Sequence, residues 1–254
     1  LRIVRQGSGP PLLLINGLGA TLEMWRPLVS GLGDREVIAF DLPGAGQSGR
    51  PLLPLRMRGI SGLVSDLIPR LGVERVDVLG YSLGGVVAQE VAFRSAELVR
   101  RLILASTTPG LPCLPPNPLV AMLMMSPARY YDRRLAERIV PIIAGGRTAN
   151  DPGVLQAGLA HRLSHPPTPA GYLHQLWSVW GWTGHLRLPR LRTPTLVLHG
   201  ASDPVVPLLN ARYMAAMIPS AQLQVIPQGG HLILFDEAPR AGAAISDFLD
   251  RAAG

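Results

Sequence analysis

Three residues of the sequence have the types and the order that nucleophilic catalysis needs. Ser82 lies at the centre of a Gly-x-Ser-x-Gly motif (residues 80–84), Asp203 follows an apolar run, and His231 follows two glycines. A serine hydroxyl is a poor nucleophile near neutral pH, so a histidine must take its proton as it attacks a carbonyl carbon. An aspartate on the far ring nitrogen fixes the tautomer of the histidine. The three residues predict a catalytic triad that forms an acyl-enzyme.

The reaction also needs hydrogen-bond donors for the negative oxygen of the tetrahedral intermediate. We expect the backbone N–H of Leu83, just after the serine, and that of Leu18, in a glycine-rich loop after the apolar run 11–15, to form this oxyanion hole. Asn16, Gly17 and Tyr81 flank these donors. We therefore expect these three residues to contact the substrate.

Two other aspartates could serve as the acid of the triad. Asp236 is near His231 in sequence, and Asp41 ends an apolar run. Asp41 is followed by a turn rich in glycine and proline, which favours a role in bonding nearby backbone N–H groups. Only Asp203 has a strand-end position between the serine and the histidine in sequence, so we assign it as the acid.

The other histidines fit structural roles better than catalytic ones. His199 lies inside an apolar run, as a buried structural side chain would. His161 and His165 are four residues apart and could share a helix face, but no third ligand accompanies them, so they do not form a zinc motif.

Short apolar runs bounded by turn residues predict strands that alternate with helices. Such alternation forces a mainly parallel sheet flanked by helices, an α/β fold, and brings the carboxyl ends of the strands to one edge. The three triad candidates follow strands and should meet at that edge. The predicted strands are residues 1–5, 11–15, 36–40, 76–79, 101–105, 195–200 and 223–226, and helices are predicted near 25–29, 60–71, 83–92, 208–217 and 238–251.

Residues 107–189 interrupt this alternation. Five prolines fall within 109–118, and helical patterns follow at 119–125, 127–143, 152–163 and 171–180. We expect a single domain, 1–254, with a core of 1–106 and 190–254 and a helical lid, 107–189, inserted after the sixth strand. The lid is rich in methionine and tryptophan, which suits an apolar substrate. Met122, Trp177 and Trp180 are expected to contact it.

The composition narrows the functional class. The net charge is +7 and all 24 basic residues are arginine, but they are spread along the chain and read as solvated side chains on helix faces. No nucleic-acid-binding motif accompanies them, so no nucleic-acid partner is expected. The single cysteine, Cys113, excludes an internal disulfide.

The sequence shows neither a signal-like start nor an apolar run near the roughly 18 residues of a membrane span. A cytoplasmic protein without cofactor, metal or transmembrane segment is expected. The chain begins at Leu1 rather than Met, which leaves room for a leader or a first strand before it.

The motifs together resemble the α/β-hydrolase family along nearly the whole chain. The matching stretches are Asn16-Gly17-Leu18-Gly19, residues 41–48, the serine motif, Gly200-Ala201-Ser202-Asp203 and Gly229-Gly230-His231. The stretches 14–20, 125–130, 181–183 and 204–210 are similar to intracellular medium-chain-length poly(3-hydroxyalkanoate) depolymerases. This resemblance implies a serine esterase that acts on an aliphatic polyester or its oligomers, with association at a polyester granule or lipid surface.

Two positions depart from the usual family pattern. Asn16 replaces the histidine that most α/β-hydrolases carry, as it does in those depolymerases, and Leu83 replaces the usual tryptophan after the nucleophile. A smaller residue there changes the acyl pocket, which leaves open a general carboxylesterase, a lactonase or a C–C bond hydrolase. A dehalogenase or epoxide hydrolase would carry aspartate in place of Ser82. A non-catalytic ligand receptor on the same fold is the remaining alternative.

Overall fold

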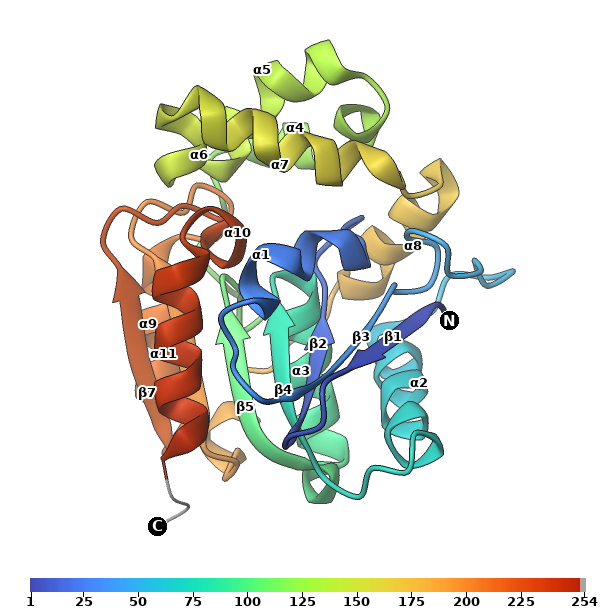
Figure 1. Ribbon diagram of the computed structural model, residues 1–254, viewed down its shortest axis with the longest axis vertical. Helices are drawn as coiled ribbons and strands as arrows, with labels where there is room; N and C mark the ends of the chain where they lie inside the picture. Colours follow the sequence, from blue (N-terminus) through green and yellow to red (C-terminus); the bar gives the residue numbers. More distant parts are fainter. Residues whose placement is uncertain (252–254) are drawn as a thin grey trace.

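A seven-stranded sheet forms the centre of the computed structural model, which describes residues 1–251 (Figure 1). The strand order is β1-β3-β2-β4-β5-β6-β7. β1 is antiparallel to β3, and all other neighbouring pairs are parallel. The predicted α/β fold is thus confirmed. The strands are β1 (Ile3–Gln6), β2 (Pro11–Ile15), β3 (Glu36–Phe40), β4 (Val76–Tyr81), β5 (Val99–Ala105), β6 (Thr195–Gly200) and β7 (Ala221–Ile226).

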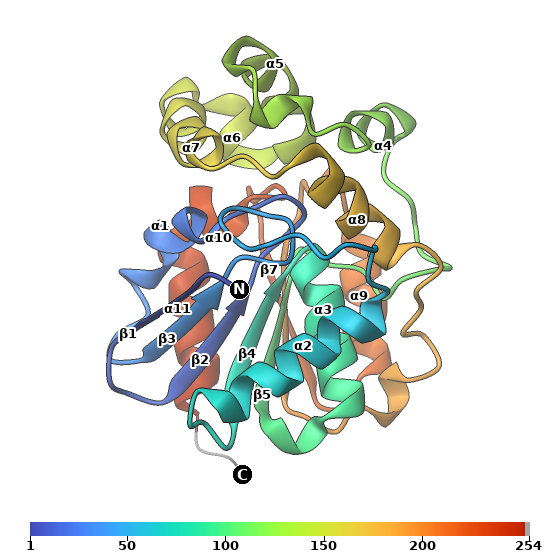
Figure 2. The same ribbon diagram turned by 90° about the vertical axis from the view of Figure 1, so that its right-hand side faces the viewer.

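The sheet divides the core into two halves because side chains alternate along each strand. Leu13 and Ile15 of β2 face one half, whereas Leu12 and Leu14 face the other. The first half is covered by α2 (Met57–Arg70), α3 (Leu83–Arg94) and α9 (Leu208–Met217); the second is covered by α1 (Arg26–Val29), α10 (Ile233–Asp236) and α11 (Ala238–Asp250) (Figure 2). Burial on both faces explains why the inner strands are almost uniformly apolar.

The segment 107–189, here called the insertion, adds no strand to the sheet, and its α-helices lie over the carboxyl ends of the strands (Figures 1 and 2). Side chains at four positions cap its helices by accepting backbone N–H bonds: Asn117, Asp132, Asp151 and Thr168. Its helices are α4 (Pro118–Met124), α5 (Arg133–Ala144), α6 (Gly146–Asn150), α7 (Pro152–Ser164) and α8 (Pro169–Val179). We propose that this segment is the lid of a single domain whose core is 1–106 and 190–254.

Two expectations about the insertion are wrong in detail. It follows β5, the fifth strand of the described chain and not the sixth, because only five segments before it pair into the sheet. The helix expected over 127–143 is divided into a 3-10 turn (Ala128–Tyr130) and α5, because the Asp132 side chain accepts the Leu135 N–H and starts a new helix.

Short 3-10 helices complete the fold at Leu22–Trp25, Ala96–Leu98 and Leu188–Arg190. None of the helices within residues 1–251 combines the length and the apolar character that crossing a bilayer requires. The cytoplasmic location stays a prediction.

Candidate active site

Ser82 lies in the tight turn between β4 and α3. Its φ of 53° is in the left-handed region that side chains rarely adopt. A Cβ on Gly80 would lie 2.4 Å from the carbonyl oxygen of Gly84, and one on Gly84 would lie 2.0 Å from that of Ile15. The glycines are therefore required by the close approach of three backbone segments. The turn holds the serine at the carboxyl edge of the sheet, as expected for a nucleophile elbow.

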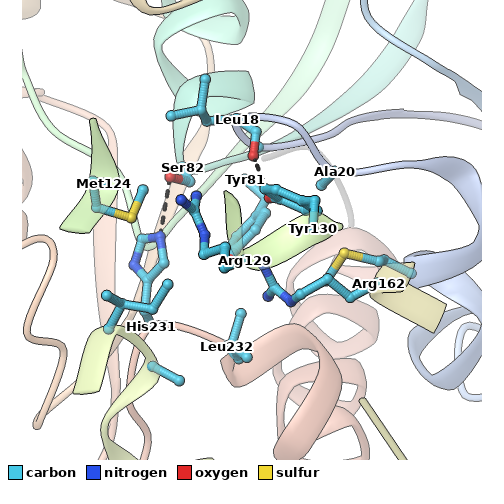
Figure 3. Close-up of a pocket in the computed structure, with 14 residues that line it drawn as sticks. Leu18, Ala20, Tyr81, Ser82, Met124, Arg129, Tyr130, Arg162, His231 and Leu232 are labelled. Atoms are coloured by element: carbon cyan, nitrogen blue, oxygen red, sulfur yellow. Dashed lines mark hydrogen bonds between the residues drawn. The ribbon is translucent and has the colours of Figure 1, made fainter. Parts of the chain in front are cut away.

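A continuous chain of hydrogen bonds links the three triad candidates. His231 Nε2 lies 3.1 Å from Ser82 Oγ (Figure 3). On the other side of the ring, His231 Nδ1 lies 2.8 Å from Asp203 Oδ2. Asp203 and His231 are both buried. In this geometry the ring nitrogen near the serine can accept its proton while the carboxylate holds the opposite N–H.

Backbone bonds fix the two partners of the serine. The second oxygen of Asp203 accepts the N–H groups of Val205 and Val206 at 2.9 and 2.8 Å, so this side chain cannot rotate freely. The backbone N–H of His231 donates to the carbonyl of Ala144, the last residue of α5, at 2.6 Å. The insertion therefore takes part in positioning the histidine.

The loop 16–19 leaves one of its amides open for a ligand. The N–H of Gly17 donates to Asn16 Oδ1, and that of Gly19 donates to Gln175 Oε1 at 2.8 Å. Within residues 1–251 the N–H of Leu18 has no such partner, nor does that of Leu83 at the first position of α3, where helical N–H groups lack an intrahelical acceptor. Both leucines line a cavity beside Ser82. The two amides are free to bind an oxyanion.

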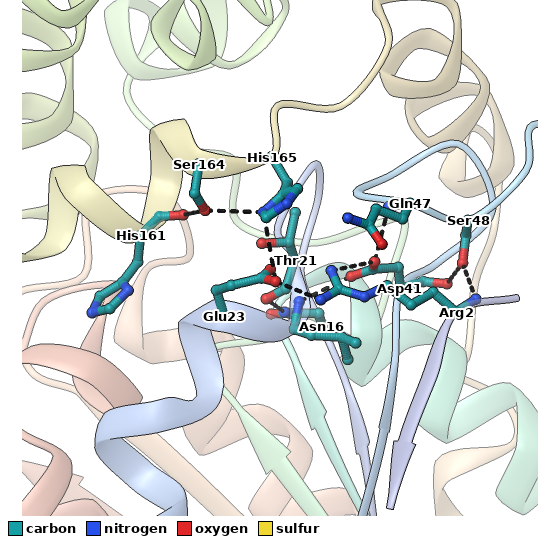
Figure 4. A network of polar contacts seen from close by, with 11 residues as sticks. Arg2, Asn16, Thr21, Glu23, Asp41, Gln47, Ser48, His161, Ser164 and His165 are labelled. Carbon is teal, nitrogen blue, oxygen red and sulfur yellow. Dashed lines mark hydrogen bonds and ion pairs between the residues drawn. The ribbon is translucent and has the colours of Figure 1, made fainter.

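Asn16 has a structural role, so the expectation that it contacts the substrate is wrong. It is fully buried, its Nδ2 donates to the Thr21 carbonyl at 2.6 Å, and it lines neither cavity beside the serine. It belongs to a polar network under the loop 16–21 that also contains Glu23 and Asp41 (Figure 4). Asp41 accepts the backbone N–H groups of Leu22 and Gln47, which confirms that it is a turn former.

Two cavities meet at Ser82, and they share Leu18 and Met124. The larger, of about 220 Å³, is mainly apolar and has walls from Leu83, α8 and the segment before α4. The smaller, of about 30 Å³, includes Gly17 and Tyr81 among its walls, as expected, and also residues of the insertion (Figure 3).

Met122, Trp177 and Trp180 line neither cavity, so the expectation that they contact a substrate held there is wrong. They are exposed by 63, 46 and 72 %. Residues two apart on a helix point in nearly opposite directions, so Met124 faces the cavity and Met122 faces solvent. On α8 it is Leu176 and Val179 that face inward.

The alternative acid lies apart from this chain of bonds, whereas His199 lies beside it, with Nε2 3.5 Å from Asp203 Oδ2. Asp236 accepts from the hydroxyl and N–H of Thr148, and burial raises its pKa. His199 is fully buried behind Asp203 and donates from Nε2 to the Val206 carbonyl; burial lowers its pKa, which favours the neutral ring. Its burial and this bond support the structural role expected of it. Residues 1–251 contain no cluster of three side chains suited to holding a metal ion.

Several residues at the site were not anticipated. Arg129, Tyr130 and Arg162 line the smaller cavity, and Gln175 lines the larger one. Arg129 and Arg162 are buried, which contradicts the expectation that the arginines are solvated. The only signal for the first two was that they lie within 125–130, a stretch similar to the depolymerases; nothing in the sequence distinguished Arg162 from an ordinary arginine near a helix end.

The fold and the serine at its elbow define an α/β hydrolase, and the chain belongs to the α/β-hydrolase family: residues 10–238 match the family model for the alpha/beta hydrolase fold. The chain is 39% identical over 242 residues to a poly(3-hydroxyalkanoate) depolymerase from Ectopseudomonas oleovorans, which covers 95% of this chain and 84% of that protein. The expected resemblance to these depolymerases is confirmed.

Two solved structures show the same architecture along nearly the whole chain. A hydrolase from Pseudomonas aeruginosa PA01 has a TM-score of 0.83 at 26% identity, covering 98% of this chain and 94% of that one. A thermophilic esterase from Thermogutta terrifontis has a TM-score of 0.82 at 28% identity, covering 98% and 92%. The family and these relatives identify the protein as a hydrolase.

Proposed function

We propose that the protein is a serine hydrolase that cleaves carboxylic esters of apolar acyl or 3-hydroxyacyl groups. The observation that carries this proposal is the hydrogen-bonded chain from Ser82 Oγ through His231 to Asp203, placed at the wall of an apolar cavity. No cofactor has a part in the proposed reaction.

Each step uses a group that the structure brings to the serine. His231 takes the proton of Ser82 Oγ as the oxygen attacks the ester carbonyl carbon, and the oxyanion accepts hydrogen bonds from the amides of Leu18 and Leu83. The C–O bond then breaks, and His231 gives the proton to the leaving alcohol. Water, activated by the same histidine, attacks the acyl-enzyme and releases the carboxylic acid and the free serine.

The shape of the larger cavity supports an aliphatic acyl group. Its walls include Leu83, Val86, Leu176, Val179 and Val206, and no carboxylate lines it. An apolar wall stabilises an acyl chain by removing it from water. Together with the likeness to a poly(3-hydroxyalkanoate) depolymerase, this supports a medium-chain hydroxyacyl ester as substrate.

The exposed face of the insertion supports contact with an insoluble polyester. Five large apolar side chains on or next to α4 and α8 expose between 46 and 72 % of their surface. They are Met122 and Met125 at α4, and Leu173, Trp177 and Trp180 at α8. These two helices also supply inner walls of the apolar cavity. Large exposed apolar side chains of this kind mark interaction surfaces. We propose that this face rests on the surface of a polyester granule.

Replacing Ser82 with alanine tests the proposed chemistry. Turnover of p-nitrophenyl esters should fall by at least about 1000-fold, because the triad loses its nucleophile while the fold keeps its core. Wild-type protein should be labelled covalently by a fluorophosphonate, and Ser82→Ala should not, with unchanged circular dichroism as the control for folding. Retained turnover in the variant would exclude Ser82 as the nucleophile. A substrate panel that also contains a lactone separates ester hydrolysis from the lactonase alternative.

A further inference from the structure

The smaller cavity at Ser82 is basic, in contrast to its apolar neighbour. Arg129 from the 3-10 turn and Arg162 from α7 both line it, together with Tyr81 and Tyr130 (Figure 3). No aspartate or glutamate lines either cavity. The two sides of the serine therefore offer an ester two different environments.

Arg162 is a buried cation without an anionic partner. Its exposed fraction is 7%, and within residues 1–251 no carboxylate lies within ion-pair distance of its guanidinium and no acceptor forms a hydrogen bond with it. Its guanidinium carbon lies 5.3 Å from the centre of the Tyr130 ring. By contrast, the half-buried Arg100 and Arg187 are paired with Asp77 and Glu90. Burying an unpaired charge is costly, so such a group usually meets an anion.

Arg129 adds a second positive charge that is also not neutralised. It is 1% exposed and donates to the Tyr172 hydroxyl at 2.8 Å and to the Ser126 carbonyl at 2.6 Å, both uncharged acceptors. Its Nε is buried with no hydrogen-bond partner in the described residues. These bonds hold the side chain at the cavity wall, and no carboxylate neutralises its charge.

Tyr81 supplies a neutral donor beside these charges. Burial raises the pKa of its hydroxyl well above the ordinary value, and the positive charge of Arg162 opposes this rise. The hydroxyl therefore keeps its proton at neutral pH. A guanidinium and a phenol O–H together are well suited to binding a carboxylate.

We propose that this cavity binds the free carboxylate of the leaving group, with Arg162 as the residue that determines this specificity. The inference rests on the proposed ester hydrolysis. In a 3-hydroxyalkanoate oligomer the terminal carboxyl carbon is four bonds, about 5 Å, from the last ester carbonyl carbon. The acyl part then lies in the apolar cavity and only the terminal carboxylate enters the basic one, so the chain is cut next to its carboxyl end.

The chemistry of this cut balances with one water for each ester bond. Ser82 Oγ forms the acyl bond, the C–O bond to the terminal unit breaks, and His231 protonates the alkoxide of that unit. The terminal unit leaves as a free hydroxyacid. Water then releases the remaining chain with a new terminal carboxylate, which is again a substrate of the same kind.

The test compares two forms of one medium-chain 3-hydroxyalkanoate dimer, the free acid and its methyl ester. Wild-type kcat/KM for the internal ester bond should be about 10- to 100-fold higher for the acid, as expected for a charge-assisted hydrogen bond. In Arg162→Met this ratio should fall close to one, and Arg162→Lys should retain part of it. Arg138→Met, which removes the same charge from an exposed position on α5, should keep the wild-type ratio.

A second measurement uses wild-type protein alone and therefore tests the inference even if Arg162→Met does not fold. Hydrolysis of a soluble p-nitrophenyl ester by wild-type protein should be inhibited competitively by the free hydroxyacid monomer, and at least about tenfold less by its methyl ester. The inference would be overturned if wild type hydrolysed the two dimers with equal kcat/KM, or if folded Arg162→Met kept the wild-type ratio. Equal inhibition of wild type by the acid and the ester would overturn it as well. Failure of the proposed function would differ from these results, since neither dimer nor any p-nitrophenyl ester would then be hydrolysed.

Discussion

Asp203 shows how much of the candidate site depends on single atoms. One carboxylate oxygen accepts two backbone N–H groups, and the other faces His231 Nδ1 at 2.8 Å and His199 Nε2 at 3.5 Å. Its position after β6 and before the histidine in sequence was enough to predict it, because strand ends meet at one edge of a parallel sheet. The cavity side of a helix was not predictable in the same way: the run 119–125 is apolar on every face, so periodicity could not separate Met124 from Met122.

Replacing Asp203 with asparagine should lower kcat by about 1000- to 10,000-fold. The amide would place a donor where the aspartate now holds the Nδ1–H of His231, which favours the wrong tautomer of the ring. Steady-state kinetics with a p-nitrophenyl ester measures the effect. Asp236→Asn is the matched control, since burial already favours the neutral form of that carboxyl, and its kcat should stay within a few fold of wild type. Equal losses in both variants would contradict the assignment of Asp203.

At the scale of elements, helices of the insertion hold the loop that contains Leu18. Gln175 of α8 accepts the Gly19 N–H and donates to the Pro43 carbonyl, and the Tyr130 hydroxyl donates to the Leu18 carbonyl at 2.8 Å. The sequence predicted strands and most helices well because their apolar periods are regular. It did not predict α6 or α10, which are one-turn helices too short to show a period. Nor did it predict these contacts, which join residues 112 to 156 positions apart.

Gln175→Leu should act on catalysis through the position of the loop. The change leaves the buried Gly19 N–H without an acceptor, at a cost of about 1–3 kcal/mol in the free energy of unfolding. We expect kcat to fall by about tenfold with a smaller change in KM, because the oxyanion is bound only after substrate binding. Gln175→Glu keeps an acceptor for the Gly19 N–H but loses the donor to the Pro43 carbonyl, so it should recover only part of kcat. Equal kcat in the leucine variant and wild type would show that the loop keeps its position without this bond.

The polar network below the same loop makes stability depend on pH. Burial disfavours the charged form of Glu23, but the hydrogen bond from Arg2 at 2.7 Å and the positive charge of Arg2 help to lower its pKa from 4.5 to about 2 (Figure 4). A carboxyl whose folded pKa is lowered stabilises the fold above its unfolded pKa, and this contribution is lost as the pH falls toward the folded value.

Glu23→Gln should therefore be less stable than wild type at about pH 6, and the difference should shrink between about pH 4.5 and pH 2. Urea unfolding of both proteins at several pH values gives the two free energies of unfolding. Subtracting them removes the titration of the other carboxyl groups, which both proteins share. A difference that stays constant over this range would show that the ionisation of Glu23 does not contribute.

At the scale of the whole molecule, apolar surface and catalytic cavity lie on the same helices. The net charge of +7 and the absence of lysine predicted neither the exposed apolar face of α4 and α8 nor the buried arginines, because composition does not say which side chains become buried. The double variant Met122→Ser/Trp180→Ser should lower the ratio of activity on polyester particles to activity on a soluble ester by several fold, since fewer apolar groups leave water at the particle surface.

Turbidity clearing and a soluble p-nitrophenyl ester assay give the two rates for that ratio. Val4→Ser, at an exposed position on the edge strand β1, provides the control and should not change it. An unchanged ratio in the double variant would mean that the particle is bound by another face.

The bond from the His231 N–H to the Ala144 carbonyl has a consequence for protein engineering. Residues 107–189 look like an interchangeable module, yet they hold the histidine through Ala144 and the loop 16–19 through Tyr130 and Gln175. A chimaera that takes this segment from another hydrolase would therefore exchange part of the catalytic framework along with the substrate pocket. Such a graft should succeed only if the donor segment brings a carbonyl at the position that ends α5 here and partners for both loop contacts.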